Sequence, residues 1–442
     1  MENLKKIHIE TYGCQMNISD SEIVASILTD NGYQVTEDVM LADIIFVNTC
    51  SIRENAEDRV RKRLNYFKSL KKKRPGLLIG LLGCMADRTK TALMEEEQLL
   101  DLVAGPDSYR HLPQLLEQVG TGQRAIDTIL SVEETYADIT PVRLDSNGVS
   151  AFISIMRGCE NYCSYCVVPS TRGQERSRDA ASIIRETRDL FEKGYREVTL
   201  LGQNVNSYSW NAGDTTITFA NLLEKVAAIH PLMRIRFATS HPKDISDELL
   251  HTIARNPNLC KAIHLPVQSG SNHMLDLMNR KYTREIYRER IEAIRKIIPD
   301  CAISTDIIAG FCDETEEDHQ DTLSLMEWVC YDTAYMFKYS ERPQTLAADT
   351  LKDNVAADVK DRRLTEIINL QHQLSLQRNL KDVGKTVEIL IEGTSKRSDN
   401  QLFGRNTQNK VAVFTKTQQG PGEYVMVKIT GATSATLLGE VV

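Results

Sequence analysis

The sequence predicts an α/β protein in three parts. A parallel α/β domain comes first, a partial (β/α)6 barrel follows, and a small antiparallel β-barrel ends the chain. Strand-like and helix-like stretches alternate through about the first 120 residues and again from about residue 151 to about residue 378, whereas the rest holds short strands between turns. We place the domains at residues 1–120, 149–378 and 379–442, with a connector at 121–148 that carries few periodic signals.

The first domain is predicted from strand-like runs that are each followed by a helical stretch. Continuous apolar runs are typical of strands buried on both faces of a parallel sheet. A helix with a capping box from Ser19 to Glu22, ending at Gly32, follows the first run, and a helix from about Ala86 follows the third. The strand candidates are residues 5–10, 43–48 and 77–82.

Six further strand candidates make the second block. Helical stretches separate them, and six such units favour a barrel or partial barrel over an open sheet. The candidates are residues 151–157, 197–202, 234–239, 262–267, 302–310 and 333–340. Short strands at 385–393, 402–406, 410–414 and 423–432 predict the final small barrel, a fold that often binds RNA.

The composition excludes a strongly basic nucleic-acid binder. Hydrophobic residues make up 41% of the chain, charged residues make up 26%, and the formal net charge is −8. From Arg378 onward, nine Lys/Arg and six Asp/Glu give +3, so the remainder carries −11. No apolar run approaches the roughly 20 residues of a membrane-spanning helix, and the start lacks the apolar core of a signal peptide. We expect a cytoplasmic protein.

Three cysteines lie close together directly after the first predicted barrel strand. Cys159, Cys163 and Cys166 form the pattern C-x3-C-x2-C. Three thiolates can hold three irons of a [4Fe–4S] cluster and leave the fourth iron open for substrate chemistry. A structural zinc site would need a fourth ligand, and none follows at zinc-finger spacing. A zinc site and buried free thiols remain the alternatives.

Three other cysteines are far apart in the sequence but occupy equivalent positions. Cys14, Cys50 and Cys84 each lie past the carboxyl end of a predicted parallel strand and before a helix. Ligand sites in α/β sheets occur at this edge, and helix N-termini favour thiolates. Position therefore makes a second metal site plausible, while three cysteines buried in strand-end turns remain the alternative.

The motifs around these cysteines resemble those of the radical S-adenosylmethionine (SAM) methylthiotransferases. C-x3-C-x2-C at the first strand of a β/α barrel resembles the radical SAM signature, and ETYGCQMN, NTCSIR and GCMA resemble the family's N-terminal domain. RGQERSR, LGQNVN, HLPVQSGS and MFKYSERP match as well, and the last domain resembles a TRAM domain. YGCQMN is similar to the MiaB branch, which acts on tRNA, and differs from the branches that act on a ribosomal protein or on threonylcarbamoyladenosine.

The resemblance implies an enzyme that converts N6-isopentenyladenosine, next to the tRNA anticodon, to its 2-methylthio derivative. It implies two [4Fe–4S] clusters, one on each cysteine triplet, with SAM at the open iron of the C-x3-C-x2-C cluster. One SAM would methylate a sulfur on the auxiliary cluster, and another would yield a 5′-deoxyadenosyl radical that attacks the base. A radical route suits an unactivated aromatic C–H, and the base must leave its stack.

The partners implied are a tRNA anticodon stem-loop and a reduced flavodoxin or ferredoxin-type electron donor, and we expect a monomer. A non-catalytic iron–sulfur RNA-binding redox sensor is the rival from another class, and it would not cleave SAM.

Polar residues at the carboxyl ends of the barrel strands are candidates for binding the cofactor. Each of them alone could be a simple helix cap. The strand-end candidates are Gln203, Ser240, Gln268 and Asp306. Glu175, Arg176 and Arg178, just beyond the cysteine loop, complete the set.

Residues 59–74 contain nine Lys/Arg and no acid. They form either the solvated face of an amphipathic helix, with Val60, Leu64 and Phe67 turned inward, or a surface that follows RNA phosphates. The sequence does not separate these two interpretations. Further candidate RNA contacts are Arg378, Lys381, Lys385, Lys396, Arg397 and Arg405.

The chain departs from the family pattern at Cys312, Asp313 and Gln344. The family usually has Pro-Gly at the first two positions and Gly at the third. We expect Cys312 to be exposed in its turn and not to be a ligand. The cysteines expected in the core are Cys260, Cys301 and Cys330.

Overall fold

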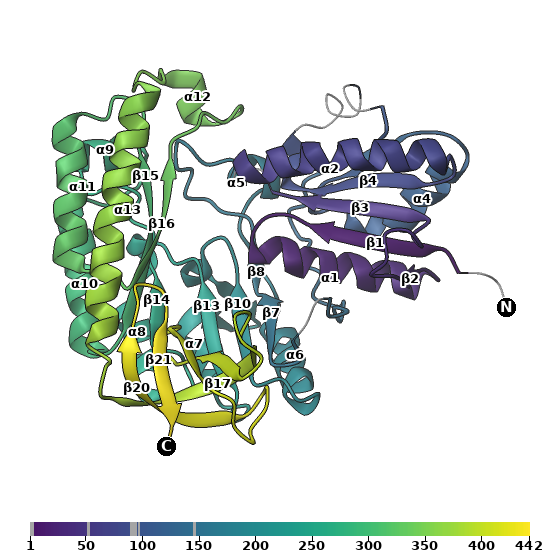
Figure 1. Cartoon of the computed structure of the whole chain (residues 1–442). Helices are drawn as coiled ribbons and strands as arrows, with labels where there is room; N and C mark the ends of the chain where they lie inside the picture. Colours follow the sequence, from purple (N-terminus) through teal and green to yellow (C-terminus); the bar gives the residue numbers. More distant parts are fainter. Residues whose placement is uncertain (1–3, 51–53, 89–94, 96–97, 145–146) are drawn as a thin grey trace. The chain divides into compact units, whose positions relative to one another are not determined.

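The computed structural model describes residues 4–50, 54–88, 95, 98–144 and 147–442 (Figure 1). The chain divides into two compact units. Unit 1 comprises residues 1–145, 154–160 and 166–178, and unit 2 comprises residues 146–153, 161–165 and 179–442. The chain therefore passes repeatedly from one unit to the other within the segment that carries the C-x3-C-x2-C loop.

Unit 1 contains the predicted parallel sheet. Its six strands have the order β2-β1-β3-β4-β5-β6, and all pairings are parallel. The strands are β1 (Lys6–Thr11), β2 (Gln34–Val35), β3 (Ile44–Thr49), β4 (Leu78–Gly83), β5 (Leu102–Ala104) and β6 (Ala125–Asp127). Residues 154–160 and 166–178 add β8 (Met156–Arg157), α5 (Val168–Arg172) and β9 (Arg176–Ser177). The N-terminal part of the predicted fold is thus confirmed.

Helices cover both faces of this sheet, as the apolar pattern requires. Helices α1 (Gln15–Asp30) and α4 (Leu112–Gly120) pack on one face, and α2 (Glu54–Lys73) packs on the other. Strand β3 is buried throughout, because its alternate residues contribute to the two opposite cores. Its continuous apolar sequence follows from this double burial.

Two expectations for unit 1 were wrong. Helix α1 begins at Gln15 and not at Ser19, because Cys14 is its N-cap residue and the Cys14 N–H donates to Asn17 Oδ1 at 3.3 Å. The expected connector 121–148 contributes the edge strand β6. Strands of two or three residues, such as β2, β5 and β6, are too short to show a period in the sequence.

Unit 2 contains six strands in two three-stranded sheets, β7-β10-β13 and β14-β15-β16. A parallel bridge from Ile235 to Leu259 joins β13 to the segment before β14. The strands are β7 (Ser150–Ser154), β10 (Glu197–Leu201), β13 (Arg234–Ala238), β14 (Ala262–His264), β15 (Ala302–Ala309) and β16 (Thr333–Lys338). This arrangement, which follows the sequence order, confirms the partial barrel.

Helices follow these strands along the chain. They are α6 (Ala180–Glu192), α7 (Phe219–Ala227), α8 (Asp247–Arg255), α9 (Asn272–Leu277), α10 (Arg284–Ile297), α11 (Glu316–Val329), α12 (Leu346–Thr350) and α13 (Ala357–Leu380). A hairpin of β11 (Ser209–Ala212) and β12 (Thr215–Thr218), which we did not predict, follows β10.

The C-terminal domain is a closed barrel in the order β17-β18-β19-β21-β20, called here the small barrel. Its strands are β17 (Thr386–Thr394), β18 (Gln401–Arg405), β19 (Val411–Thr415), β20 (Tyr424–Ala432) and β21 (Leu437–Val441). Four pairings are antiparallel, whereas β19 and β21 are parallel. Strand β21, which was not predicted, is only partly buried and contains a glycine, so it lacks an apolar run.

The small barrel is fastened to the amino-terminal part of β13 by two buried arginines. Arg234 donates to Arg405 O at 2.6 Å and to Glu388 Oε1 at 2.9 Å. Arg236 donates to Asn406 O at 2.7 Å and pairs with Glu197 at 2.8 Å. Figure 1 shows the small barrel at the bottom, with the arrowhead of β16 pointing away from it. Because the small barrel contacts the amino-terminal part of β13, it does not cover the carboxyl ends of the unit 2 strands, where a site can form.

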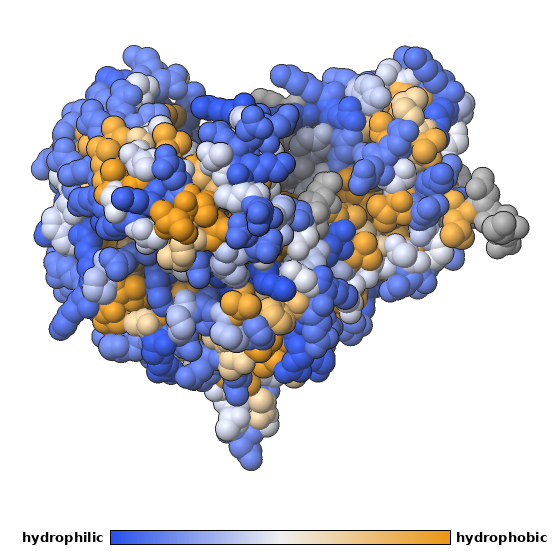
Figure 2. All heavy atoms as spheres, turned by 60° about the horizontal axis from the view of Figure 1, so that its bottom comes forward, coloured by the Kyte–Doolittle hydropathy of each residue, from blue (hydrophilic) through white to orange (hydrophobic). Residues whose placement is uncertain are grey.

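Figure 2 turns the bottom of Figure 1 forward and shows apolar surface interspersed with hydrophilic surface. Among the described residues, no helix is long and apolar enough to cross a membrane.

Candidate metal centres

Three cysteines meet at the carboxyl edge of the unit 1 sheet. Cys14, Cys50 and Cys84 follow the ends of β1, β3 and β4, which are neighbours in the sheet. The loops are tightly packed, because a Cβ on Gly13 (φ +141°) would lie 2.5 Å from Cys50 Cβ. The topology therefore brings together residues that are 36 and 34 positions apart in the sequence, as predicted.

The electrostatics of this cluster suit metal ligands. A hydrogen bond from Cys50 lowers the pKa of Cys14 to about 6, although burial acts in the opposite direction, and the Arg172 charge lowers it further. Burial raises the pKa of Cys84, but the Nε of Arg172 donates to its Sγ at 3.2 Å. All ten cysteines are free thiols. Three adjacent thiols beside a buried cation fit an iron–sulfur cluster.

A buried ion-pair network lies behind these thiols. Asp20 forms an ion pair with Arg157 at 2.9 Å and accepts a hydrogen bond from Arg172 at 2.8 Å, and Asp107 pairs with Arg176 at 3.0 Å. All three arginines come from residues 154–160 and 166–178, so these parts of the chain are fastened to α1 and to the loop after β5 within unit 1. Arg176, a candidate for binding the cofactor, is thereby occupied in holding the structure. No local sequence pattern distinguishes Arg157 or Arg172 as a supporting residue.

The C-x3-C-x2-C loop is partly exposed at each thiol. In unit 1 the Cys159 N–H donates to Gly173 O at 3.2 Å, and a Cβ on Gly158 would lie 1.9 Å from Gln174 O. In unit 2 the Cys163 Sγ accepts from Arg280 Nη1 at 3.2 Å. Backbone contacts therefore fix the loop, while its sulfurs stay accessible for a cluster. Arg280 is a further residue that the sequence analysis missed.

The candidates for binding the cofactor fall in three settings. Gln203 and Ser240 lie two residues past the ends of β10 and β13. Gln203 Oε1 and Ser240 Oγ are buried without a hydrogen-bond partner among the described residues. Such orphaned polar atoms fit a polar ligand. Gln268 has φ +72°, and its N–H donates to Asp306 O at 2.9 Å. Asp306 lies within β15, so its expected place at a strand end was wrong.

The remaining two candidates lie beside the cysteine loop in unit 1. Glu175 Oε1 accepts from the Glu160 N–H at 3.3 Å. Arg178 is buried and donates to Ser154 O at 3.3 Å.

An open face of β14–β16, which the sequence analysis missed, adds aromatic surface. We define it by His264, Ser304, Asp306, Tyr335 and Phe337, which alternate with buried residues along the three strands. Tyr335 and Phe337 are 49% and 37% exposed, and Asp306 pairs in register with Tyr335. The His264 ring meets Tyr335 edge-on at 5.7 Å. Aromatic residues at alternate positions in residues 333–340 were the available signal.

A buried neutral histidine follows the same strand as Ser240. Burial lowers the pKa of His241 to about 2, and the Arg280 charge acts in the same direction. Its Nε2 has no hydrogen-bond partner in the described part of the chain. It is a further polar group without a partner near the end of β13.

The expected burial was wrong for one cysteine and only partly right for another. Cys312 is 1% exposed, and not exposed as expected, because it packs in a core with Phe311 and Tyr339. Cys260 and Cys301 are buried as predicted, whereas Cys330 ends α11 with φ +51° and is only half-buried.

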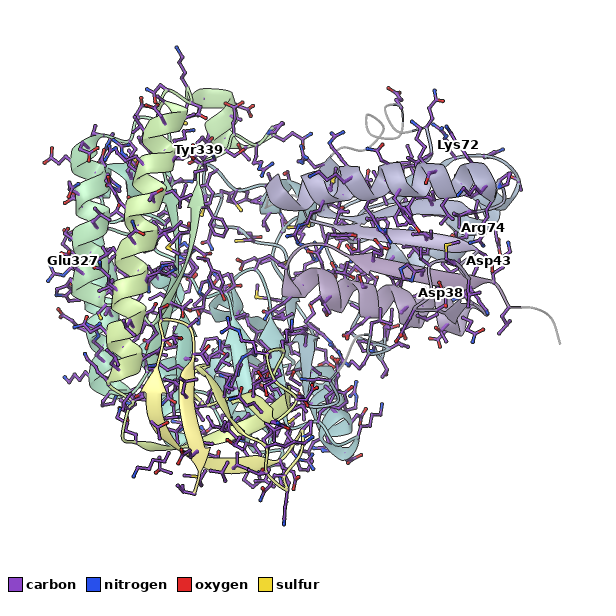
Figure 3. The ribbon with its side chains drawn as sticks, in the orientation of Figure 1. Asp38, Asp43, Lys72, Arg74, Glu327 and Tyr339 are labelled. Carbon is purple, nitrogen blue, oxygen red and sulfur yellow. The ribbon has the colours of Figure 1, made fainter. Side chains whose placement is uncertain are left out.

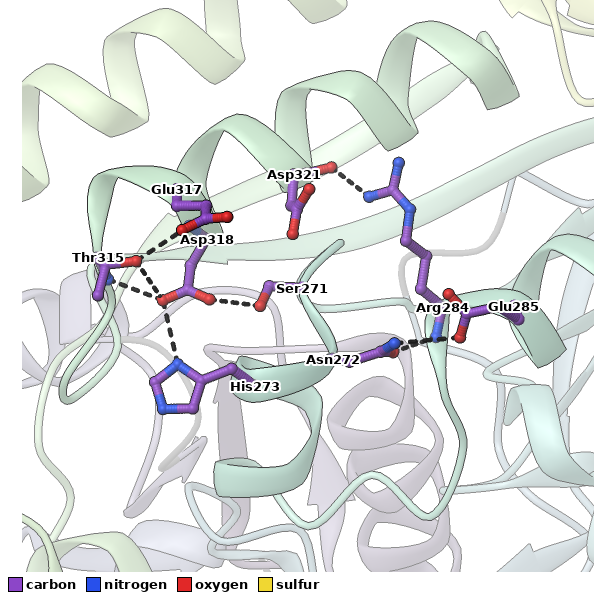
Figure 4. A pocket seen from close by; sticks show the side chains of 9 residues that line it. All are labelled: Ser271, Asn272, His273, Arg284, Glu285, Thr315, Glu317, Asp318 and Asp321. Carbon is purple, nitrogen blue, oxygen red and sulfur yellow. Dashed lines mark hydrogen bonds and ion pairs between the residues drawn. The ribbon is translucent and has the colours of Figure 1, made fainter.

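A polar pocket of about 550 Å³ lies at the N-termini of α9, α10 and α11 (Figure 4). Asp318 accepts from the Thr315 N–H at 2.9 Å, meets His273 Nδ1 at 3.1 Å and also binds Ser271. These hydrogen bonds outweigh burial and lower the pKa of Asp318 to about 2. Since its side chains satisfy one another as helix caps, we assign this pocket no ligand.

Glu316, His319 and Glu366 are spaced closely enough for a metal ion. Arg362 pairs with both carboxylates, at 2.7 and 2.9 Å. The group is therefore an ion-pair cluster between α11 and α13.

Helix α2 buries Val60, Leu64 and Phe67 completely, as the amphipathic interpretation predicts. Just after this helix, Arg74 donates to Met40 O at 2.9 Å and to Ala42 O at 2.6 Å, whereas Lys72 is exposed (Figure 3). The exposed basic side chains are Arg59, Arg61, Lys62, Lys68, Lys72 and Lys73.

Of the basic candidates in the C-terminal segment, Arg378 pairs with Asp332 at 3.1 Å, and Arg405 lies 3.7 Å from Glu392. The exposed ones are Lys381, Lys385, Lys396 and Arg397.

Three family models match the chain: "Uncharacterized protein family UPF0004" at residues 6–105, "Radical SAM superfamily" at 153–326 and "TRAM domain" at 380–442. Each match lies inside one predicted domain. Curated relatives called tRNA-2-methylthio-N(6)-dimethylallyladenosine synthase are similar over almost the whole chain. The one from Amoebophilus asiaticus is 59% identical (99% of this chain, 92% of the relative), and the one from Flavobacterium johnsoniae is 53% identical (100% and 95%).

Solved structures support the fold. The radical SAM methyltransferase TsrM from Kitasatospora setae matches with a TM-score of 0.58 at 14% identity, covering 78% of this chain and 74% of that one. The cobalamin-dependent radical enzyme OxsB matches with a TM-score of 0.55 at 13% identity, covering 84% and 56%.

Proposed function

The chain belongs to the family of tRNA-2-methylthio-N(6)-dimethylallyladenosine synthases, and we propose that it converts N6-isopentenyladenosine beside the tRNA anticodon to its 2-methylthio derivative. One observation carries the proposal: Cys14, Cys50 and Cys84 converge beside a buried arginine, in a chain that also has the C-x3-C-x2-C loop. A methylthiotransferase needs this second site in addition to the first.

Each triplet would hold one [4Fe–4S] cluster. When bound, the clusters and SAM supply the methyl group, the sulfur carrier and the hydrogen-abstracting radical. The orphaned oxygens of Gln203 and Ser240 offer hydrogen bonds to polar groups of SAM. Gln268, Glu175 and Arg178 are further proposed contacts.

The open face of β14–β16 would receive the unstacked base. Tyr335 and Phe337 offer exposed aromatic surface for stacking, and Asp306 lies beside Tyr335 as a hydrogen-bond acceptor. Exposed lysines and arginines of α2 and of the small barrel would bind phosphates of the RNA.

Cleavage of SAM also consumes an electron. We assign its delivery to a reduced flavodoxin or ferredoxin-type protein, and we propose that the enzyme is a cytoplasmic monomer.

The test is an anaerobic reaction with the reconstituted protein, dithionite, SAM and an isopentenylated anticodon stem-loop, followed by mass spectrometry. We expect methylthiolated RNA together with 5′-deoxyadenosine. Cys159→Ala should abolish both products, Cys84→Ala should abolish the methylthiolated RNA, and Cys260→Ala, at a buried cysteine outside both triplets, serves as the matched control. A protein that holds both clusters and yields neither product would be the non-catalytic redox sensor.

A further inference from the structure

In each cysteine triplet, a buried arginine donates a hydrogen bond to a cysteine sulfur. Arg172 Nε lies 3.2 Å from Cys84 Sγ, and Arg280 Nη1 lies 3.2 Å from Cys163 Sγ. The two arginines are 3% and 4% exposed. Burying a guanidinium is costly unless anionic or hydrogen-bonding partners compensate it, so each position requires an explanation.

The charge of Arg280 has no carboxylate partner within the described part of the chain. Its other partners are neutral: Tyr282 Oη at 3.0 Å, Tyr165 Oη at 3.4 Å and Pro266 O at 2.8 Å. The thiol of Cys163 is thus the one partner among these that becomes anionic as a metal ligand.

The charge of Arg172 is only partly compensated. Its Nη2 donates to Asp20 at 2.8 Å, but Asp20 also pairs with Arg157 at 2.9 Å. In addition, Arg172 Nη1 is buried without a hydrogen-bond partner among the described residues. One carboxylate shared by two guanidiniums leaves positive charge beside Cys84.

We propose that Arg172 and Arg280 are positioning residues that separately set the reduction potentials of the two clusters, Arg172 through Cys84 and Arg280 through Cys163. This inference rests on the proposed function, which assigns a cluster to each triplet. A cluster on three thiolates is anionic, and one-electron reduction adds one negative charge. A nearby cation and a hydrogen bond to a ligand sulfur stabilise the reduced form and raise the potential.

The two arginines should differ in strength. Because no carboxylate offsets Arg280, we expect Arg280→Gln to change the ratio of reduced to oxidised cluster at a fixed potential at least tenfold. For a one-electron couple this equals a shift of about 59 mV towards more negative potential. Arg172→Gln should shift its own cluster in the same direction by less, because Asp20 already offsets part of the charge.

The experiment uses full-length chains that keep one cluster each. Cys14→Ala leaves the C-x3-C-x2-C cluster, and Cys159→Ala leaves the auxiliary one. Each arginine variant is made in both backgrounds, and the potential is measured by dithionite titration with electron paramagnetic resonance. Arg280→Gln should act only in the Cys14→Ala chain, and Arg172→Gln should act only in the Cys159→Ala chain.

Two further variants separate charge from misfolding. Arg280→Lys keeps the charge, so the reduction potential of its cluster should lie between those of Arg280→Gln and the wild type. Asp20→Asn removes the offsetting carboxylate and should shift the auxiliary cluster towards more positive potential, which a loosened fold would not produce. Unchanged potentials in chains that hold their cluster, or equal shifts of both clusters, would overturn this inference. If the parent single-cluster chains bind no cluster, the proposed ligand assignment itself fails.

Discussion

Replacing Gly13 by alanine should remove the auxiliary cluster and leave the other one in place. Gly13 has φ +141°, and an added Cβ would lie 2.5 Å from Cys50 Cβ and 2.7 Å from Asn17 Oδ1. The backbone strain costs about 1–2 kcal/mol and the overpacking about 1–3 kcal/mol. Together these costs, about 2–5 kcal/mol, disfavour the loop conformation that places Cys14 beside Cys50 by about 30-fold to 4,000-fold.

Gly32 provides the matched control, because it also has positive φ (+82°) but nothing within 4 Å of its added Cβ. Iron and labile sulfide are measured per chain after anaerobic reconstitution. Gly13→Ala should hold half the iron of the wild type, whereas Gly32→Ala should hold all of it. Full iron content in Gly13→Ala, or an equal loss in Gly32→Ala, would refute the argument that close packing builds this site.

Three other outcomes are expected. Gln344→Gly should raise the urea midpoint of unfolding, because relief of the left-handed strain at φ +67°, about 1–2 kcal/mol, exceeds the cost of a flexible glycine, about 0.5–1 kcal/mol. Asp313→Gly should gain less, since it loses the hydrogen bond that the Asn354 side chain donates to the Asp313 carboxylate. A lowered midpoint in Gln344→Gly would contradict this reasoning. Burial raises the pKa of Glu10, but hydrogen bonds from His8, Arg63 and Tyr12 outweigh burial and lower this pKa to about 2. The ionised carboxylate therefore stabilises the fold above pH 4.5, and this contribution, at most about 3 kcal/mol, should be lost as the pH falls towards 2. Denaturant titrations should show the loss in the wild type and not in Glu10→Gln. The double variant Tyr335→Ala, Phe337→Ala should bind an isopentenylated stem-loop at least tenfold more weakly in fluorescence anisotropy, because each stacked base contributes about 1–3 kcal/mol. Leu232 is an exposed residue just before β13, and the control variant Leu232→Ala should bind the stem-loop as the wild type does.

The sequence was sufficient for much of the fold because its main signals are local. Alternation of apolar and polar residues placed β1, and apolar runs placed β3 and β4. The position of a cysteine just after each of these strands predicted that the three would meet. Resemblance added the identity of the family. Short edge strands such as β6 left no such signal, since a strand of three residues has no measurable period.

The supporting residues of the site could not be found in this way. Arg172 and Arg280 contact sulfurs that are 88 and 117 positions away, and nothing local distinguishes them from surface arginines. Cys312 was placed in an exposed turn because turn residues are commonly exposed, but tertiary packing against Phe311 and Tyr339 buries it. Long-range contacts decided each of these cases.

The attachment of the small barrel has a consequence for the length of the substrate. Arg234 and Arg236 hold that barrel at the beginning of strands whose opposite ends carry Gln203 and Ser240. Five residues of strand cover roughly 17 Å. An oligonucleotide that bridges both ends must extend at least that far, so turnover should rise with the number of base pairs in the stem until the RNA reaches the small barrel, and level off beyond it.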